Sequence, residues 1–319
     1  MNEGATKLTD AGDAQCHRTE LAPIALFTFK RPQHTQKTLE GLATNPEFLK
    51  SPLFVFCDGA RNADEADAVR ESRRVVRDFP HPDKTVVEAP QNMGLARSVV
   101  SGVSRLCHEF GRVIVMEDDL VVSPVFLDYM NTSLKKYANE EQVYQVTGHM
   151  WPIDVPCDQD AFFMPITNSL GWGTWQRAWQ RFDNDATLWP AISANRAMRD
   201  RFNIGGRFPF SKMMEKQLQG KIDSWAIKWY LTVFAQDGIV LYPKKSLLVN
   251  IGFDGQGTHS LSFDQERYGV AYSFERVILF PAAATHSKST ELVARYLARD
   301  GSLGRRLIRR FKKTVGMIG

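Results

Sequence analysis

The stretch Arg112-Val113-Ile114-Val115-Met116-Glu117-Asp118-Asp119 decides the fold expected for this chain of 319 residues. A short apolar run that stops at charged residues is typical of a buried strand in a parallel sheet. Three adjacent carboxylates at the end of such a strand repel one another unless a positive charge lies beside them. Mg²⁺ and Mn²⁺ prefer oxygen ligands and often bind carboxylates together with phosphates. The stretch therefore predicts a strand that ends in a divalent-metal site; the alternative is a solvated acidic turn before the next helix.

Outward from this stretch, short apolar runs alternate with helical patterns. We expect strands over residues 23–29, 53–57, 84–88 and 112–116, and helices over residues 33–43, 63–78, 94–110 and 124–137. Repeated alternation implies right-handed βαβ units, and hence an α/β, Rossmann-like, mainly parallel sheet flanked by helices. In such sheets, ligands bind beyond the carboxyl ends of the strands.

The second half of the chain is less regular. We expect a strand, two short β-prone segments and two amphipathic helices over residues 142–147, 162–164, 240–242, 187–203 and 223–236, respectively. All seven tryptophans lie between Trp151 and Trp229. Because no internal repeat or long linker sets this half apart, we expect a single globule with an irregular C-terminal half.

The composition excludes several classes of protein. A hydrophobic share of 43% and a charged share of 24% are ordinary for a globular protein, and a net charge of +4 is too small for a dedicated nucleic-acid binder. The four cysteines form no C-x-x-C pair, so we expect no structural zinc, and a reducing cytosol fits. The chain has no Walker loop and no dinucleotide-binding glycine motif between a strand and a helix. It also has no long apolar run and no apolar signal-peptide core near Met1, so we expect a cytoplasmic protein.

Polar residues also follow the first two expected strands. Lys30 and Arg31 can neutralise a diphosphate, and a surface turn before Pro32 is the alternative. Asp58 can accept hydrogen bonds from a base or a ribose, and a simple Asp-Gly turn is the alternative. In a parallel sheet, both sets meet the acidic stretch 117–119 in one crevice.

The helix expected over residues 94–110 begins beside the same crevice. Gly94 near its N-terminus lets a ligand approach, and the helix dipole favours an anion there. Arg97 lies in the first turn and is expected to point at the crevice. A plain helix cap is the alternative.

Three features of the second half are candidates for chemistry. Trp172, with Gly171 before it, can expose an aromatic face that stacks on a sugar, or it can be a core tryptophan. Asp223 can be a general base or a helix cap. His259 ends a glycine-rich loop and can meet a phosphate or a metal, although a lone histidine is more often structural.

The order of these features resembles the nucleotide-sugar glycosyltransferases of the GT-A type. Within that class it resembles the N-acetylglucosaminyltransferase I-like group and its bacterial family 2-like relatives. The matching segments are Phe29-Lys30-Arg31-Pro32, Asp58, 115–120 with 123–126, Leu170-Gly171-Trp172, Asp223-Ser224-Trp225 and Gly257-Thr258-His259. One departure is that the family often has two acids before the tryptophan, whereas Ile222 precedes Asp223 here.

The resemblance implies a GT-A fold and metal-dependent, inverting transfer of a sugar from a nucleotide diphosphate sugar, a UDP-sugar, to a hydroxyl. The acceptor is a glycan, a polysaccharide or a lipid-linked molecule. Asp223 is implied as the base, and Asp119 with His259 as ligands of Mn²⁺ or Mg²⁺. The implied contacts to the nucleotide sugar are Phe29, Lys30, Arg31, Asp58, Arg97, Glu117 and Asp118, and those to the acceptor or sugar are Gly171 and Trp172.

The expected organisation follows from these assignments. It comprises a disordered lead-in, a nucleotide-sugar-binding part, an acceptor and catalytic part of the same domain, and C-terminal helices with a basic tail, over residues 1–21, 22–150, 151–285 and 286–319. Two other functions stay open. A sugar nucleotidyltransferase also needs paired acids and basic residues, but residues 27–33 lack its usual glycine-rich loop. A non-catalytic nucleotide-sugar or glycan-binding protein is the other.

The net charge is concentrated in the last residues. Residues 302–319 hold six cations and no acid, so the rest of the chain is slightly acidic. Leu303, Leu307, Phe311 and Val315 repeat every four residues, as in a basic amphipathic helix that binds an anionic membrane surface. The alternative is a solvated helix docked on the core. The pattern predicts a protein that is peripheral on the inner face of the plasma membrane.

Overall fold

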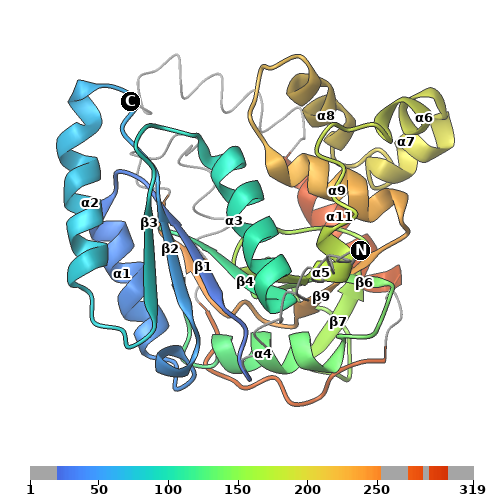
Figure 1. Ribbon diagram of the computed structural model, residues 1–319. Coiled ribbons are helices and arrows are strands. Elements are labelled where there is room, and N and C mark those ends of the chain that lie inside the picture. The colour runs from blue at the N-terminus through green and yellow to red at the C-terminus, as the bar shows by residue number, and fades with distance from the viewer. Residues whose placement is uncertain (1–19, 253–271, 283–286, 301–319) are drawn as a thin grey trace, which may run out of the picture.

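The computed structural model describes residues 20–252, 272–282 and 287–300. Figure 1 shows a central sheet with helices on both sides. The predictions for the lead-in, for His259 and for the basic tail 302–319 lie outside the described residues.

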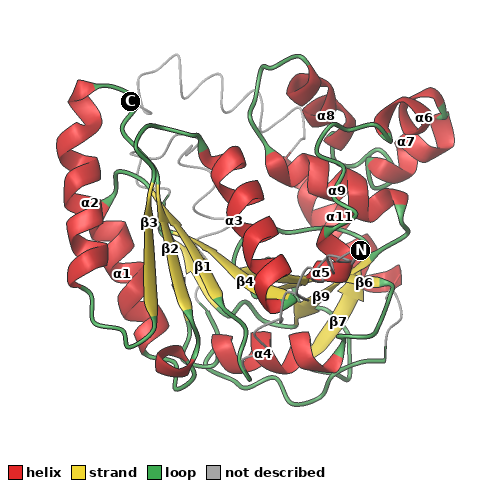
Figure 2. Cartoon of the chain, viewed as in Figure 1, coloured by secondary structure: helices red, strands yellow, loops and turns green. Residues whose placement is uncertain are grey.

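Eight strands form one mixed sheet in the order β3-β2-β1-β4-β8-β6-β9-β7 (Figure 2). The strands β3, β2, β1 and β4 are parallel, and so are β6 and β9. The predicted α/β class with a mainly parallel sheet is therefore confirmed. The bounds are Ile24–Thr28 (β1), Leu53–Cys57 (β2), Lys84–Glu88 (β3), Arg112–Glu117 (β4), Val143–Thr147 (β6), Ala161–Met164 (β7), Trp172–Trp175 (β8) and Ile239–Pro243 (β9).

Two strands run against the others. β8 lies between β4 and β6 and is antiparallel to both, and β7 is antiparallel to β9 at the sheet edge. A separate two-stranded sheet joins β5 (Leu120–Val122), which follows the acidic stretch, to β10 (Leu248–Asn250). The second half of the chain thus completes the sheet begun by the first half.

The helices cover the two faces of the sheet (Figure 1). α1 (Pro32–Ala43), α2 (Ala66–Asp78) and α4 (Phe126–Lys136) contribute to one core, and α3 (Leu95–Phe110), α5 (Gln176–Trp179), α9 (Trp225–Ala235) and α11 (Ser287–Asp300) contribute to the other. The remaining helices are α6 (Trp189–Ala194), α7 (Arg196–Phe202), α8 (Phe210–Leu218) and the 3₁₀ turns η1 (Phe48–Lys50) and η2 (Ala63–Glu65). Within the described part of the chain, no helix has the length and apolar character to cross a bilayer.

The alternation of side chains along β1 explains these two cores. Ile24 and Leu26 lie in the core under α1, α2 and α4, whereas Ala25 and Phe27 lie in the core under α3 and α9. All five residues of β1 are buried, because a strand covered on both faces needs apolar side chains on both. This explains why the strand appears in the sequence as a continuous apolar run.

The tryptophans of the second half form a packed cluster. The ring centroids of Trp172 and Trp225 lie 5.0 Å apart, and those of Trp179 and Trp229 lie 5.1 Å apart. The cluster joins β8 to α9, so it fixes the first turn of α9 against the sheet.

Candidate active site

The polar strand ends meet at one edge of the sheet. β2, β1 and β4 are neighbours, and because they are parallel their carboxyl ends share one edge. Arg31 lies just beyond β1, Asp58 follows β2, and the acidic stretch 117–119 ends β4. The chain continues from β1 to β2 on one side and reaches β4 on the other, so this is the place where the strand order reverses. Ligands of open α/β sheets bind at such a point.

Two hydrogen bonds hold Asp118 in place at this edge of the sheet. Its side chain is buried, and its carboxylate accepts a hydrogen bond from the backbone N–H of Phe29 at 3.1 Å. The hydroxyl of Thr38, on α1, donates to the backbone carbonyl of Asp118 at 2.9 Å. Both contacts come from the segment that follows β1, so β1 and β4 position this carboxylate together.

Arg31 is the cation nearest to the acids. Its Nη2 atom lies 3.2 Å from Oδ2 of Asp119 and 3.7 Å from Oδ1 of Asp118. The residue stands at the N-terminal end of α1, where Pro32 occupies the first turn and Thr35 donates its backbone N–H to the Arg31 carbonyl. The helix start therefore holds the guanidinium against the acidic stretch.

Burial and mutual repulsion dominate the electrostatics of the acids. Burial, and next the charges of Asp119 and Asp118, raise the pKa of Glu117 to about 8. Burial, and next the charge of Asp119, raise the pKa of Asp118 to about 7, although Arg31 opposes this. Burial also raises the pKa of Asp119, again against Arg31. One guanidinium thus leaves the three carboxyls short of positive charge, as expected of residues that bind a cation.

The residues present fit a metal that is held only partly by protein. Among the described residues, no three His, Cys, Asp or Glu side chains gather around one point. Mg²⁺ and Mn²⁺ are commonly bound by one or two carboxylates and by substrate phosphates. The carboxylates of Asp118 and Asp119 suit such a site, because they are buried and Arg31 only partly compensates their negative charge.

The segment Asn250–Gly252 closes one side of this site. The backbone N–H of Ile251 donates to the carbonyl of Asp119 at 2.8 Å. A Cβ atom at Gly252 would collide with the carboxylate of Asp119, and it would lie 2.8 Å from Nη1 of Arg31. Only glycine therefore lets the backbone pass over this ion pair at position 252.

Sequence reasoning missed His34, on the first turn of α1. Its Nε2 atom lies 3.3 Å from the carbonyl oxygen of Ile251, and together with Arg31 it partly opposes the rise in the pKa of Asp119 that burial causes. The signal was present in the sequence, because a residue in the first turn after β1 must lie at the same edge as Arg31. The significance of Gly252 depends on the β5–β10 pairing, which the sequence did not reveal.

Lys30 and Phe29 lie beside a second ionic cluster. Nζ of Lys30 lies 2.7 Å from Oε1 of Glu65, which also accepts hydrogen bonds from Arg61. Hydrogen bonds from Arg61 and next from Lys30 lower the pKa of Glu65 to about 2. The Arg61 guanidinium lies 5.4 Å from the centroid of the Phe29 ring. Glu65 thus places two cations around the ring of Phe29.

Asp58 holds the loop before α3. Its carboxylate accepts hydrogen bonds from the backbone N–H groups of Gly59, Met93 and Gly94 at 2.8, 2.7 and 3.0 Å, and from the side chain of Asn92 at 2.9 Å. Asp58 is therefore the anchor of the segment that opens α3. Arg97 lies on the first turn of that helix and is exposed, and its direction toward the acids stays a prediction.

Asp223 faces the same helix start from the second half of the chain. Ser224, not Asp223, caps α9, because its hydroxyl accepts from the N–H of Ile227 at 3.4 Å. The side chain of Asp223 is exposed, and its Oδ2 would lie 3.5 Å from a Cβ atom placed on Gly94. The alternative of a capping aspartate is thus excluded, and the carboxylate stands across from the loop that Asp58 anchors.

The expectation that Trp172 exposes a face to a sugar is wrong. The side chain is fully buried in β8, where it stacks on Trp225. Gly171 adopts φ +51°, and a Cβ atom there would collide with Leu248. Glycine precedes the tryptophan because the chain entering β8 passes so close to Phe126 of α4 and Leu248 of β10 that no side chain fits at position 171.

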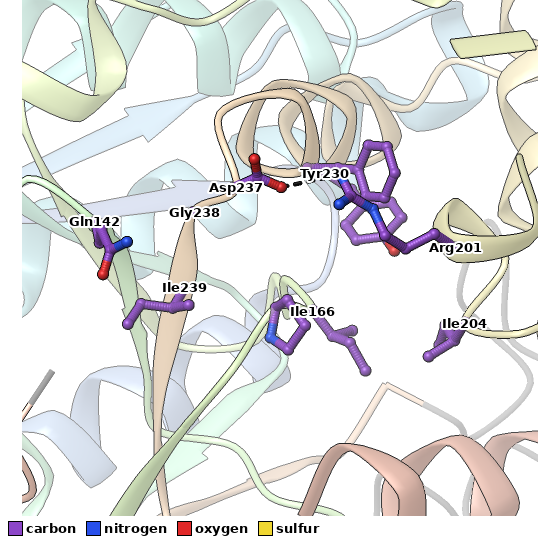
Figure 3. Close-up of a pocket in the computed structure, with 10 residues that line it drawn as sticks. Gln142, Ile166, Arg201, Ile204, Tyr230, Asp237, Gly238 and Ile239 are labelled. Atoms are coloured by element: carbon purple, nitrogen blue, oxygen red, sulfur yellow. Dashed lines mark hydrogen bonds and ion pairs between the residues drawn. The ribbon is translucent and has the colours of Figure 1, made fainter. Parts of the chain in front are cut away.

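Aromatic surface is found instead in two cavities beside α9. The cavity nearer Asp223 has a volume of about 230 Å³, and Trp151, Phe208, Phe210 and Ile227 are among its lining residues. The other has a volume of about 520 Å³ (Figure 3), and its lining includes Arg201 and Asp237, whose side chains are joined at 2.9 Å. Ile166 and Tyr230 line both cavities.

The fold and this edge define an α/β protein with a cluster of acids beside Arg31 at the reversal of its strand order. The sequence is 25% identical over 139 residues to an alpha-1,3-mannosyl-glycoprotein 2-beta-N-acetylglucosaminyltransferase of Arabidopsis thaliana. The match covers 41% of this chain and 30% of that protein, so it spans less than a third of the relative. It supports the predicted resemblance to glycosyltransferases of the N-acetylglucosaminyltransferase I-like group.

A solved structure is also similar. A mannosyltransferase from Pyrobaculum calidifontis, in complex with GDP-Man and Mn²⁺, aligns with a TM-score of 0.36 and 16% identity, over 71% of this chain and 76% of that one. No protein-family model matches the sequence.

Proposed function

We propose that this protein is a metal-dependent glycosyltransferase that moves a sugar from a nucleotide diphosphate sugar, a UDP-sugar, to a hydroxyl of a glycan, polysaccharide or lipid-linked acceptor. The acids 117–119, of which Asp118 and Asp119 are buried, carry this proposal, because they lie beside Arg31 where the strand order reverses. The partial match to a sugar-transferring enzyme supports it. In this account the protein is an enzyme of class EC 2.4.

The donor lies along the carboxyl edge of β2, β1 and β4. Phe29, Lys30 and Arg31 stand beside the nucleotide, and Arg97 faces its phosphates from the start of α3, where the helix dipole also favours an anion. Asp58 acts through the loop 91–94 that it anchors. Asp118 and Glu117 orient the ribose and the sugar.

Asp119 is the proposed metal ligand, and His259 the proposed second one. A bound Mn²⁺ or Mg²⁺ supplies positive charge that stabilises the departing diphosphate. Arg31, which lies 3.2 Å from Asp119, adds a guanidinium beside this ligand that would also favour the diphosphate.

Asp223 is the proposed base. The acceptor hydroxyl gives its proton to this carboxylate as its oxygen forms the new bond to C1 of the sugar. The bond from C1 to the diphosphate oxygen breaks in the same step, and its electron pair leaves with the nucleotide. Attack from the face opposite the leaving group inverts the configuration at C1. The exposure of Asp223 across from Gly94 supports this role, since the carboxylate is open to an incoming hydroxyl.

A thermal-shift experiment tests the donor class. UDP, GDP and their sugars are each added with Mn²⁺ or with EDTA, because a ligand that binds the folded state raises its stability. We expect stabilisation by UDP that disappears with EDTA. Stabilisation by GDP alone would overturn the choice of nucleotide. A separate turnover assay distinguishes the other two functions. Turnover that requires pyrophosphate would identify a nucleotidyltransferase, and tight binding without turnover would identify a binding protein.

We also propose that the enzyme is cytoplasmic and works at the inner face of the plasma membrane, through the basic segment 302–319. The pattern of six cations and regularly spaced apolar residues supports this. Truncation after Asp300 is expected to release the protein from anionic vesicles in a flotation assay. Equal flotation of the full and truncated chains would contradict the proposal.

A further inference from the structure

The two cavities beside α9 follow one stripe of that helix. Ala226 and Ile227 line the near cavity, Tyr230 lines both, and Phe234 lines the far cavity. These positions recur at steps of three and four residues, so they share one face of the helix. From Ala226 to Phe234 the helix rises about 12 Å. The cavities together therefore follow most of the length of α9.

The two ends of this stripe lie at opposite edges of the sheet. The near end starts within one turn of Asp223, because Ser224 caps the helix on the N–H of Ile227. The far end reaches Gly238 and Ile239 at the beginning of β9, and β9 runs in the same direction as β4. The cavities thus lead away from the acidic crevice, toward the opposite edge of the sheet.

Apolar side chains make up most of the lining of the near cavity. Its lining includes Phe208, Phe210, Met213 and Leu297, and none of its lining residues among those described carries a charge. The side chain of Asn168, which also lines it, is already hydrogen-bonded to His149 and to the N–H of Leu170. Thr167 and Ser169 add hydroxyl groups next to Asn168, but most of the lining side chains are apolar, whereas a site for a sugar chain needs several convergent hydrogen-bonding groups.

The far cavity also has apolar walls, together with Gln142 and two charged residues. Figure 3 shows Ile166, Ile204 and Ile239 around the space, with the ring of Tyr230 above it. Its two charged side chains, Arg201 and Asp237, are paired with each other, and Arg201 also lies 4.6 Å from the centroid of the Phe234 ring. Both charged residues line only the far cavity, so the stretch of α9 from Ala226 to Phe234 faces no unpaired charge in either lining.

We propose that the acceptor is amphiphilic and that its apolar chain lies in the near cavity along α9, with its hydroxyl at Asp223. Longer chains extend past Ile166 and Tyr230 into the far cavity. This inference rests on the proposed transferase function, because it identifies the acceptor as the lipid-linked class. The stripe of α9 that lines both cavities and begins within one turn of Asp223 carries it.

The test measures binding of methyl, octyl and dodecyl β-glucosides below their micelle concentrations, by isothermal titration calorimetry on the full chain with UDP and Mn²⁺ present. Each buried methylene is expected to strengthen binding up to about fourfold until the cavity is filled. Equal affinity for methyl and dodecyl glucosides would overturn the proposal. Failure of UDP to bind in the same cell would instead contradict the proposed function, so the two failures are distinguishable.

Variants show where the chain lies. Ala226→Phe fills the near cavity and is expected to abolish the dependence on chain length. Ala235→Phe makes the same change on α9 at a residue that lines neither cavity, and is expected to retain that dependence. If Ala226→Phe does not fold, Met213→Asp replaces it, because a carboxylate at this half-buried wall is expected to weaken octyl glucoside binding more than tenfold. An unchanged dependence in the wall variant would place the chain elsewhere and overturn the proposal.

Discussion

Nη2 of Arg31 lies 3.2 Å from Oδ2 of Asp119, and a Cβ atom at Gly252 would collide with that same carboxylate. The end of β4, the start of α1 and the segment after β10 therefore meet at one ion pair. Three parts of the chain far apart in sequence must keep this geometry together, so changes at any of them are expected to affect the same ligand.

Asp119→Asn is expected to weaken Mn²⁺-dependent UDP binding more than about tenfold, which is about 1.4 kcal/mol. The substitution removes the negative charge that attracts the cation and keeps the size of the side chain. Calorimetric titration of UDP with Mn²⁺ measures the effect. Asp67→Asn on α2, where the side chain is 87% exposed, is the matched control and should bind as the unchanged protein does. Equal affinity of the two variants would remove Asp119 from the metal site.

Gly252→Ala is expected to destabilise the protein by about 1–3 kcal/mol because the added methyl group meets Asp119 and Arg31. It should also weaken UDP binding, since the ion pair must move. Chemical denaturation and titration measure the two effects. Gly220→Ala meets no neighbouring atom within 4 Å but is strained at φ +66°, so it is a glycine replacement that destabilises the protein away from the ion pair. If that control lowers UDP affinity as much, the contact with Asp119 is not the cause.

Asp58→Ala is expected to destabilise the protein by about 2–4 kcal/mol, because three backbone N–H groups and one amide lose a charged acceptor. Urea denaturation measures this loss. Asp154→Ala, at an exposed position, should change the free energy of unfolding little. A small effect at Asp58 would mean that solvent readily replaces these hydrogen bonds.

Glu65 predicts a dependence of stability on pH. Its pKa falls from the usual 4.5 to about 2 in the folded protein, so its ionised form stabilises the fold above pH 4.5. That contribution is lost as the pH falls from about 4.5 toward 2. The difference in unfolding free energy between the unchanged protein and Glu65→Gln should therefore shrink over this range. Glu140→Gln, at an exposed position, should show no such trend. A difference that is independent of pH would contradict the pairing with Arg61 and Lys30.

The elements of the first half follow from the sequence because each is local. A continuous apolar run marks a strand covered on both faces, and the start of α1 is marked by Pro32. The meeting of Arg31 and the acids 117–119 follows from parallel topology alone. The burial of Trp172 does not follow, because it depends on an antiparallel strand inserted between β4 and β6. The anchoring role of Asp58 also depends on a loop 34 to 36 residues away, whose position no local pattern determines.

Asp223→Asn is expected to lower transfer by at least about 100-fold while leaving UDP binding unchanged, because the amide cannot accept the acceptor's proton. Ser224→Ala, at the next residue, removes the cap of α9 and should cost about 1 kcal/mol of stability without a comparable loss of rate. Steady-state rates with saturating donor separate the two variants. Full activity of Asp223→Asn would exclude it as the base.

The most direct measurement of the central claim is the slow release of UDP from UDP-sugars, followed by NMR in the presence of Mn²⁺ and again with EDTA. We predict UDP release that needs Mn²⁺, is lost in Asp119→Asn, and gives a free sugar whose configuration at C1 is inverted. Release that continues with EDTA, or that persists in Asp119→Asn, would contradict the account.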